Sequence, residues 1–201
     1  MFREVPVLPV VVPLGAVVLG LLLWRLHRSG RLTLPRAAVA LALAVYAAGV
    51  VANTVFPIFL DKPASSAAWD AHLVLVPLVD YEVADAVTNV LVFVPLGMLL
   101  PLLLARASWW RVVLTAAAFS LAIEVTQYAT SHLLGGGHVA DASDLLFNVV
   151  GGVLGLGLFT LLSRVPALDA FFDRFRWSTA PPRGSHVDGT DARRARSAVE
   201  R

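Results

Sequence analysis

Five apolar stretches, each about twenty residues long, dominate this sequence and restrict it to a membrane fold. A helix rises about 1.5 Å per residue, so about twenty apolar residues cross a hydrocarbon core of roughly 30 Å. In lipid every backbone amide needs an internal partner, and a helix supplies one for nearly all of its amides. The composition agrees, with 58% hydrophobic residues, 15% charged residues and a mean hydropathy of +0.75. The sequence therefore predicts an all-α, polytopic membrane helical bundle.

The predicted membrane domain occupies residues 1–163. Its transmembrane helices are predicted at residues 5–24, 37–59, 86–105, 112–133 and 145–163. The first stretch could be mistaken for a signal peptide, but its apolar region is longer than the usual length of about 7–15 residues. Arg25 and Arg28 follow it where a small-residue cleavage site would be expected. We therefore expect this segment to be retained as the first span.

Basic residues are distributed unevenly between the predicted loops. Fourteen of the sixteen Lys and Arg residues fall in residues 25–36, in residues 106–111 and in the tail from Arg164 onward. Loops rich in Lys and Arg remain on the cytoplasmic side of a membrane. The sequence therefore predicts that the N-terminus lies outside and the C-terminus inside.

The chain after the fifth span divides into two parts. Residues 164–177 are predicted to form an interfacial amphipathic helix, because Leu168, Phe171, Phe172 and Phe175 recur at helical spacing. Residues 178–201 are rich in Pro, Gly, Ser, Asp and Arg and have no apolar periodicity. Such a segment cannot bury enough apolar surface to order itself, so we expect a disordered basic cytoplasmic tail.

Polar residues interrupt the predicted spans at a few positions. A charged group near the bilayer centre costs about 2.5 kcal/mol or more, so such residues need a partner or a function. Glu124 and Gln127 are three residues apart, Asp144 and Asn148 are four apart, and each pair therefore shares one helix face. Asp144 also stands where the N-cap of the fifth span is expected. With Asn89 on the third span, the predicted topology places these side chains in the outer half of the membrane, where they would line an outward-facing polar pocket.

Small residues and a proline accompany the polar faces, and we assign them a structural role. Gly151, Gly152 and Gly155 continue the polar face of the fifth span, at a spacing that lets helix backbones approach closely. Gly97 continues the polar stripe of the third span. Pro95 removes a backbone hydrogen bond and is expected to kink that helix.

The loop between the fourth and fifth spans contains three glycines, followed by His138 and Asp141. Both side chains can fold back over the polar faces below them. The predicted binding residues are therefore Asn89, Glu124, Gln127, His138, Asp141, Asp144 and Asn148. As an alternative, the amides could serve only as hydrogen bonds between helices, worth about 0.6 kcal/mol each. Glu124 could likewise be a neutral, hydrogen-bonded carboxylic acid.

Three motifs, in this order, resemble the VanZ-like family of bacterial membrane proteins over about residues 73–161. They are Asn89 with Phe93, Pro95 and Gly97; Glu124 with Gln127; and Asp141 with Asp144, Asn148 and Gly151. His138 stands where the family pattern has an arginine, so a titratable group replaces a permanent cation. The resemblance implies an effect on the cell envelope and an association with resistance to glycopeptides, in particular teicoplanin.

We expect a multi-pass protein of the bacterial cell membrane that binds a lipid or a cell-wall precursor in its polar pocket. One alternative is a membrane-embedded enzyme acting on a lipid-linked head group, with Glu124 or Asp144 as general base and His138 as acid partner. A second alternative is a proton or ion pathway. Binding is expected over catalysis, because no nucleophile with a base at recognisable spacing appears. We expect no metal, because one histidine with scattered carboxylates is a poor zinc ligand set, and we expect no cofactor and no nucleic-acid partner.

Overall fold

The computed structural model describes residues 2–60, 68–79, 81–104, 108–133 and 139–177. Within these ranges the helices are α1 Leu8–Arg28, α2 Leu34–Val55, α3 Val83–Leu103, α4 Trp109–Leu133, α5 Ala142–Leu162 and α6 Pro166–Asp173. The helices α1 to α5 are each long and apolar enough to cross a membrane. The predicted all-α bundle with five spans is therefore confirmed, whereas the orientation of the termini stays a prediction.

Two helix ends differ from the predicted spans for identifiable reasons. α2 ends at Val55, because Phe56 precedes a proline and adopts an extended conformation with ψ of 150°. α5 begins at Ala142, because the side chain of Asp141 accepts a hydrogen bond from the backbone N–H of Ser143 at 2.7 Å. The prediction that Asp144 is the N-cap of this helix is therefore wrong. Asp144 lies instead in the first turn of α5, where its carboxylate can bond to other groups.

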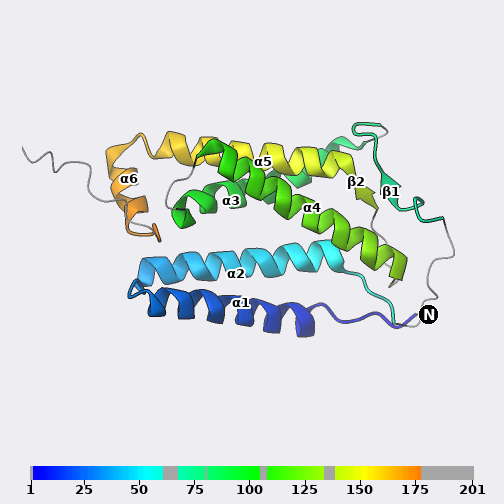
Figure 1. Ribbon diagram of the computed structural model, residues 1–201, viewed down its shortest axis with the longest axis horizontal. Helices are drawn as coiled ribbons and strands as arrows, with labels where there is room; N and C mark the ends of the chain where they lie inside the picture. The colour runs from blue at the N-terminus through cyan, green and yellow to red at the C-terminus, as the bar shows by residue number, and fades with distance from the viewer. Residues whose placement is uncertain (1, 61–67, 80, 105–107, 134–138, 178–201) are drawn as a thin grey trace, which may run out of the picture.

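The helices form an α1–α2 hairpin that lies beside a unit of α3, α4 and α5 (Figure 1). Among the described elements, α3 and α5 make the most extensive contact. Glycines make this approach possible, because a Cβ atom at Gly97, Gly151 or Gly155 would collide with backbone atoms of the opposite helix. Gly152 instead faces α4, where a Cβ would lie 2.9 Å from the Cβ of Ala116.

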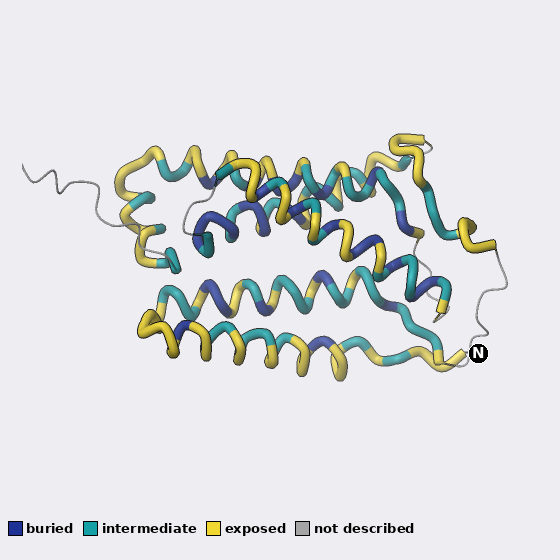
Figure 2. The backbone as a smooth tube through the Cα atoms, viewed as in Figure 1, coloured by how far each residue is buried: buried dark blue, intermediate teal, exposed yellow. Residues whose placement is uncertain are grey.

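Buried residues concentrate where α2, α3, α4 and α5 face one another, and α1 stays at the periphery (Figure 2). The buried residues of α1 are only Val11 and Leu26. Phe93 of α3 packs in one buried cluster with Val112 and Ala116 of α4. The outward faces of the helices carry large apolar side chains, as expected of surfaces in contact with lipid.

A short parallel sheet, which the sequence did not predict, joins two loops at the end of the bundle where α3 and α5 begin. Strand β1, Leu73–Val74, pairs with strand β2, Ala140–Asp141. Nearby, the backbone N–H of Leu78, which has a positive φ of 67°, donates to Ser143 Oγ at 2.9 Å. The sheet holds the segment before α5 against the segment before α3.

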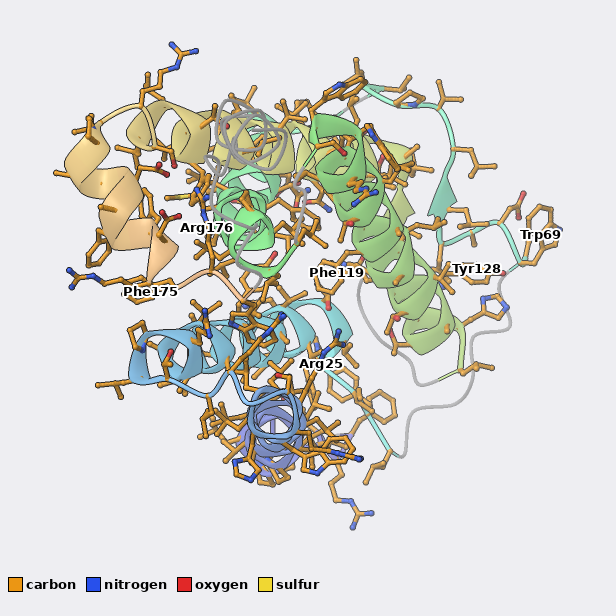
Figure 3. The ribbon with its side chains drawn as sticks, turned by 60° about the vertical axis from the view of Figure 1, so that its left-hand side comes forward. Arg25, Trp69, Phe119, Tyr128, Phe175 and Arg176 are labelled. Carbon is orange, nitrogen blue, oxygen red and sulfur yellow. The ribbon has the colours of Figure 1, made fainter. Side chains whose placement is uncertain are left out.

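The residues that follow α6 fasten the opposite end of the bundle. The backbone N–H of Trp177 donates to the carbonyl of Leu102 at 2.7 Å, and Arg36 Nε of α2 donates to the carbonyl of Arg176 at 2.8 Å. Figure 3 shows Phe175 and Arg176 at the end of α6 that lies near α2. Phe175 packs against a buried cluster that includes Phe159 of α5. The membrane-surface position of residues 164–177 stays a prediction, and the tail of residues 178–201 lies outside the described residues.

A polar cavity as the candidate binding site

A cavity of about 650 Å³ lies between α2, α3, α4 and α5. Its lining comes from the half of the bundle in which α2 and α4 end and α3 and α5 begin. The structure brings five of the predicted binding residues together there: Asn89, Glu124, Gln127, Asp144 and Asn148. Polar side chains from three spans therefore border one space, as their helix faces had indicated.

Asp144 joins α3 to α5 through one carboxylate oxygen. Asn89 Nδ2 donates to Asp144 Oδ1 at 2.6 Å, and the hydroxyl of Tyr81 donates to the same oxygen. Asn89 Nδ2 also donates to the Tyr81 hydroxyl oxygen at 2.8 Å. The ring of Tyr81 is stacked on that of Phe147, with centroids 5.2 Å apart. These contacts fix the positions of the first turns of the two helices relative to each other.

Tyr81, which the sequence reasoning missed, lies just before α3 and outside the membrane-spanning segment. Burial raises the pKa of its hydroxyl above the usual range, and the hydrogen bond to Asp144 raises this pKa further. The hydroxyl therefore stays protonated at neutral pH and remains a donor to Asp144. The available signal was a tyrosine five residues before the predicted span of residues 86–105, because aromatic residues gather at membrane interfaces.

Replacing Tyr81 with phenylalanine should lower the free energy of unfolding by about 2 kcal/mol, because a hydrogen bond to a charged group is lost while the stacked ring is kept. Tyr128→Phe is the matched control. Its hydroxyl donates to the carbonyl of Trp69 at an exposed site, with a bond of 2.9 Å, and the loss there should stay below about 1 kcal/mol. Figure 3 shows Tyr128 extending from α4 toward Trp69. Thermal unfolding in detergent measures both changes. Equal losses of unfolding free energy would show that the hydrogen bond from Tyr81 to Asp144 stabilises the protein no more than the exposed one from Tyr128.

Glu124 of α4 is the buried carboxylate of the cavity, with 7% of its surface exposed. Its Oε2 accepts a hydrogen bond from the backbone N–H of Asp141 at 2.9 Å. Its Oε1 is buried and has no hydrogen-bond partner among the described residues. Glu124 also lines a second, largely apolar cavity of about 290 Å³ between α4 and the small sheet. This residue therefore stands between a polar and an apolar space, with one carboxylate oxygen available.

Two amides and a hydroxyl add further unused polar atoms to the cavity. Asn148 Nδ2 donates to Ser120 Oγ of α4 at 2.9 Å, so this amide does link two helices. Its Oδ1, the Oε1 of Gln127 and the hydroxyl of Tyr46 are buried, and none of them has a partner in the described part of the chain. Tyr46 comes from α2 and was missed by the sequence reasoning, because a single tyrosine inside an apolar span gives no periodic signal. Hydrogen bonds between helices therefore use only part of the hydrogen-bonding capacity of the Asn148 and Gln127 amides among the described residues.

The remaining predicted residues have different positions. Asp141 caps α5 and lines the apolar cavity rather than the polar one. Pro95 lies inside α3 and lines the polar cavity. His138 lies outside the described residues. Besides Tyr46, the structure adds four polar lining residues that the sequence reasoning did not assign to the site: Asn53, Thr54, Asp85 and Thr88. Within the described ranges, no group of three or more His, Asp or Glu side chains is placed to hold a metal ion.

The fold and the cavity together define a multi-pass α-helical membrane protein with a partly open cavity, bordered by polar side chains, between its helices. The family model VanZ/LLP1 matches residues 43–163, which is more than half of the chain. The chain therefore belongs to the VanZ/LLP1 family, and the resemblance indicated by its three motifs is confirmed. The matched region contains every residue that lines the polar cavity. No curated protein and no solved structure matches the chain.

Proposed function

We propose that this protein binds the polar head group of a lipid or of a lipid-linked cell-wall precursor in the cavity between α2 and α5, and thereby alters susceptibility to glycopeptides such as teicoplanin. The observation that carries the proposal is a cavity of about 650 Å³ between apolar spans, bordered by buried oxygens of Glu124, Gln127 and Asn148 that lack partners among the described residues. A buried polar atom without a partner is costly, so the site is suited to a polar ligand. Membership in the VanZ/LLP1 family supports this reading.

The size of the cavity is also suited to a head group. Sites for small molecules usually enclose about 300–1,000 Å³ and combine apolar walls with a few placed polar groups. Here Val50, Val92 and Ile123 supply apolar wall, and Asn89 and Glu124 are among the polar groups. The cavity is therefore large enough for a sugar or for a lipid head group.

The charge distribution supports a cavity that faces outward. Arg28 and Arg36 lie at the end of the α1–α2 hairpin opposite the cavity, and Arg111 lies at the start of α4 on that same side. Arg28 stacks over Trp24, with its guanidinium carbon 5.1 Å from the ring centroid, as expected for a belt of aromatic and basic residues at an interface. By the positive-inside rule this end is cytoplasmic, so the cavity belongs to the outer half of the membrane.

Glu124→Gln and Asp144→Asn test this function. Expression of the wild-type protein in a susceptible strain should raise the inhibitory concentration of teicoplanin, and each variant should return it to the level of the empty vector. Glu82→Gln is the control, because Glu82 is exposed and outside the cavity lining. If both site variants insert normally and keep the full phenotype, the polar residues only hold the helices together, and the proposal is wrong.

Catalysis is the alternative that a specific observation favours, because Glu124 and Asp144 border the same cavity and one oxygen of Glu124 is unpartnered among the described residues. Such a pair could provide a general acid and a general base. The test is whether the purified protein turns over a labelled lipid-linked precursor. Turnover that is abolished by Glu124→Gln would show that the protein is an enzyme rather than a binding protein. Dissipation of a pH gradient in liposomes would instead indicate a proton pathway.

A further inference from the structure

We infer that the cavity recognises an ammonium group carried by a membrane amphiphile, rather than an anionic phosphate. This inference rests on the proposed function and specifies the chemical class of its ligand. It follows from the charges around the cavity, from the kind of hydrogen-bonding atoms left free in it, and from the apolar space beside it.

Carboxyl groups are the only acidic or basic side chains among the described residues that border the cavity. Asp85, Glu124 and Asp144 line it, and no Lys, Arg or His occurs among the lining residues that the structure describes. Among these described lining residues a phosphate would meet carboxyl groups, and it would lack the guanidinium or ammonium groups that usually hold it. A cation is favoured by the same arrangement.

Three of the four unpartnered atoms at the cavity, among the described residues, can only accept a hydrogen bond and therefore match a donor. Glu124 Oε1, Gln127 Oε1 and Asn148 Oδ1 are acceptor oxygens, and all are buried without partners in the described ranges. The residues that carry them are 7%, 7% and 3% exposed, respectively. An ammonium group has three N–H donors and no acceptor, whereas an ionised phosphate offers mainly acceptors. These three acceptor oxygens therefore complement an amine and not a phosphate, whereas the hydroxyl of Tyr46, also unpartnered in the described ranges, can donate or accept and suits either ligand.

The surroundings favour an amphiphilic source of this amine. The polar cavity lies between spans, and Glu124 lines both this cavity and the apolar cavity of about 290 Å³. Leu121 and Val125 of α4 and Leu145 of α5 line the apolar cavity. An amphiphile whose ammonium group binds at Glu124 could therefore place its alkyl chain against the apolar cavity. A soluble amine has no chain to make this contact.

Binding of probes that share one alkyl chain tests the inference. Octadecylamine, octadecanol and octadecyl phosphate are titrated against the purified full-length protein in phosphatidylcholine nanodiscs, with binding followed by microscale thermophoresis. We expect the amine to bind at least about tenfold more tightly than the phosphate, because it gains charge-assisted hydrogen bonds. Glu124→Gln should weaken amine binding by about tenfold and leave octadecanol binding nearly unchanged. Glu82→Gln removes an exposed charge outside the cavity and should change neither affinity.

A second variant keeps the test valid if Glu124→Gln folds poorly. Gln127→Met removes one acceptor at similar volume and should weaken amine binding by roughly threefold. If octadecyl phosphate binds more tightly than octadecylamine, or if all three probes bind equally, the cavity does not select an ammonium group. The proposed binding of a head group would not be contradicted by that result. Absence of saturable binding by any probe to folded protein would contradict the proposed function itself. Equal affinity for 2-aminoethanol, which has no chain, would overturn the amphiphilic source.

Discussion

Replacing Gly155 with leucine should force α3 and α5 apart and lower the free energy of unfolding by about 3 kcal/mol or more. A Cβ at position 155 would collide with the carbonyl oxygen of Val94 and would lie 3.0 Å from the Cα of Gly97. Both are backbone atoms of α3, so no side-chain rotation can relieve the contact. Because α3 and α5 also carry Asn89 and Asp144, their separation should disturb the polar cavity as well.

Gly157→Leu is the matched control for this prediction. Gly157 lies on the same helix, and a Cβ there would meet no atom within 4 Å. Its substitution should change the unfolding free energy by less than about 0.5 kcal/mol. Thermal unfolding of the purified proteins in detergent, followed by circular dichroism, compares the variants. Equal stability of Gly155→Leu and Gly157→Leu would show that α3 and α5 do not pack through their glycines.

Replacing Asp144 with alanine should have the second large effect, a loss of about 3 kcal/mol in the free energy of unfolding. The substitution removes the oxygen that accepts hydrogen bonds from both Tyr81 and Asn89. The half-buried hydroxyl of Tyr81 would then lack its acceptor, and the half-buried amide of Asn89 would keep only the Tyr81 hydroxyl oxygen as acceptor. Lost hydrogen bonds of partly buried donors are costly. The first turns of α3 and α5 would also lose their polar link.

Asp144→Asn and Asp85→Ala separate this effect from a simple loss of charge. The asparagine keeps a carbonyl oxygen in the position of the acceptor, so about half of the lost stability should return. Asp85 is an exposed carboxylate on the first turn of α3, also at the cavity, and its removal should cost less than about 1 kcal/mol. Chemical unfolding in mixed micelles measures the three variants. The shared-acceptor role would be contradicted if Asp85→Ala destabilised the protein as much as Asp144→Ala.

The positions of the spans and their polar faces could be predicted because they depend on local sequence. Hydropathy over about twenty residues defines a transmembrane helix, and spacings of three or four place residues on one face. Glu124 with Gln127, and Asp144 with Asn148, therefore appeared on shared faces, and these four residues do border one cavity. Each placement required only the geometry of a single helix.

The details of the site could not be predicted, because they depend on residues far apart in the chain. Tyr81 reaches Asp144 across 63 positions, and Asn148 reaches Ser120 across 28. The pairing of β1 with β2 places Asp141 so that its backbone N–H holds Glu124. No periodicity within a helix signals such contacts, so Tyr81 was missed as a partner of Asp144.

The sequence by itself determined that this protein is an all-α membrane bundle of the VanZ/LLP1 family with polar faces on three spans. The reason is that apolar stretches of about twenty residues cross lipid as helices that satisfy their own backbone, and that residues three or four apart on a helix share a face. The tertiary structure alone decided which polar atoms are already used and which are free. Asp144 is satisfied by Tyr81 and Asn89, whereas Glu124 keeps an unpartnered oxygen within the described chain. The physical reason is that hydrogen-bond satisfaction depends on distances between helices, and those distances are set where glycine lets the backbones of α3 and α5 meet.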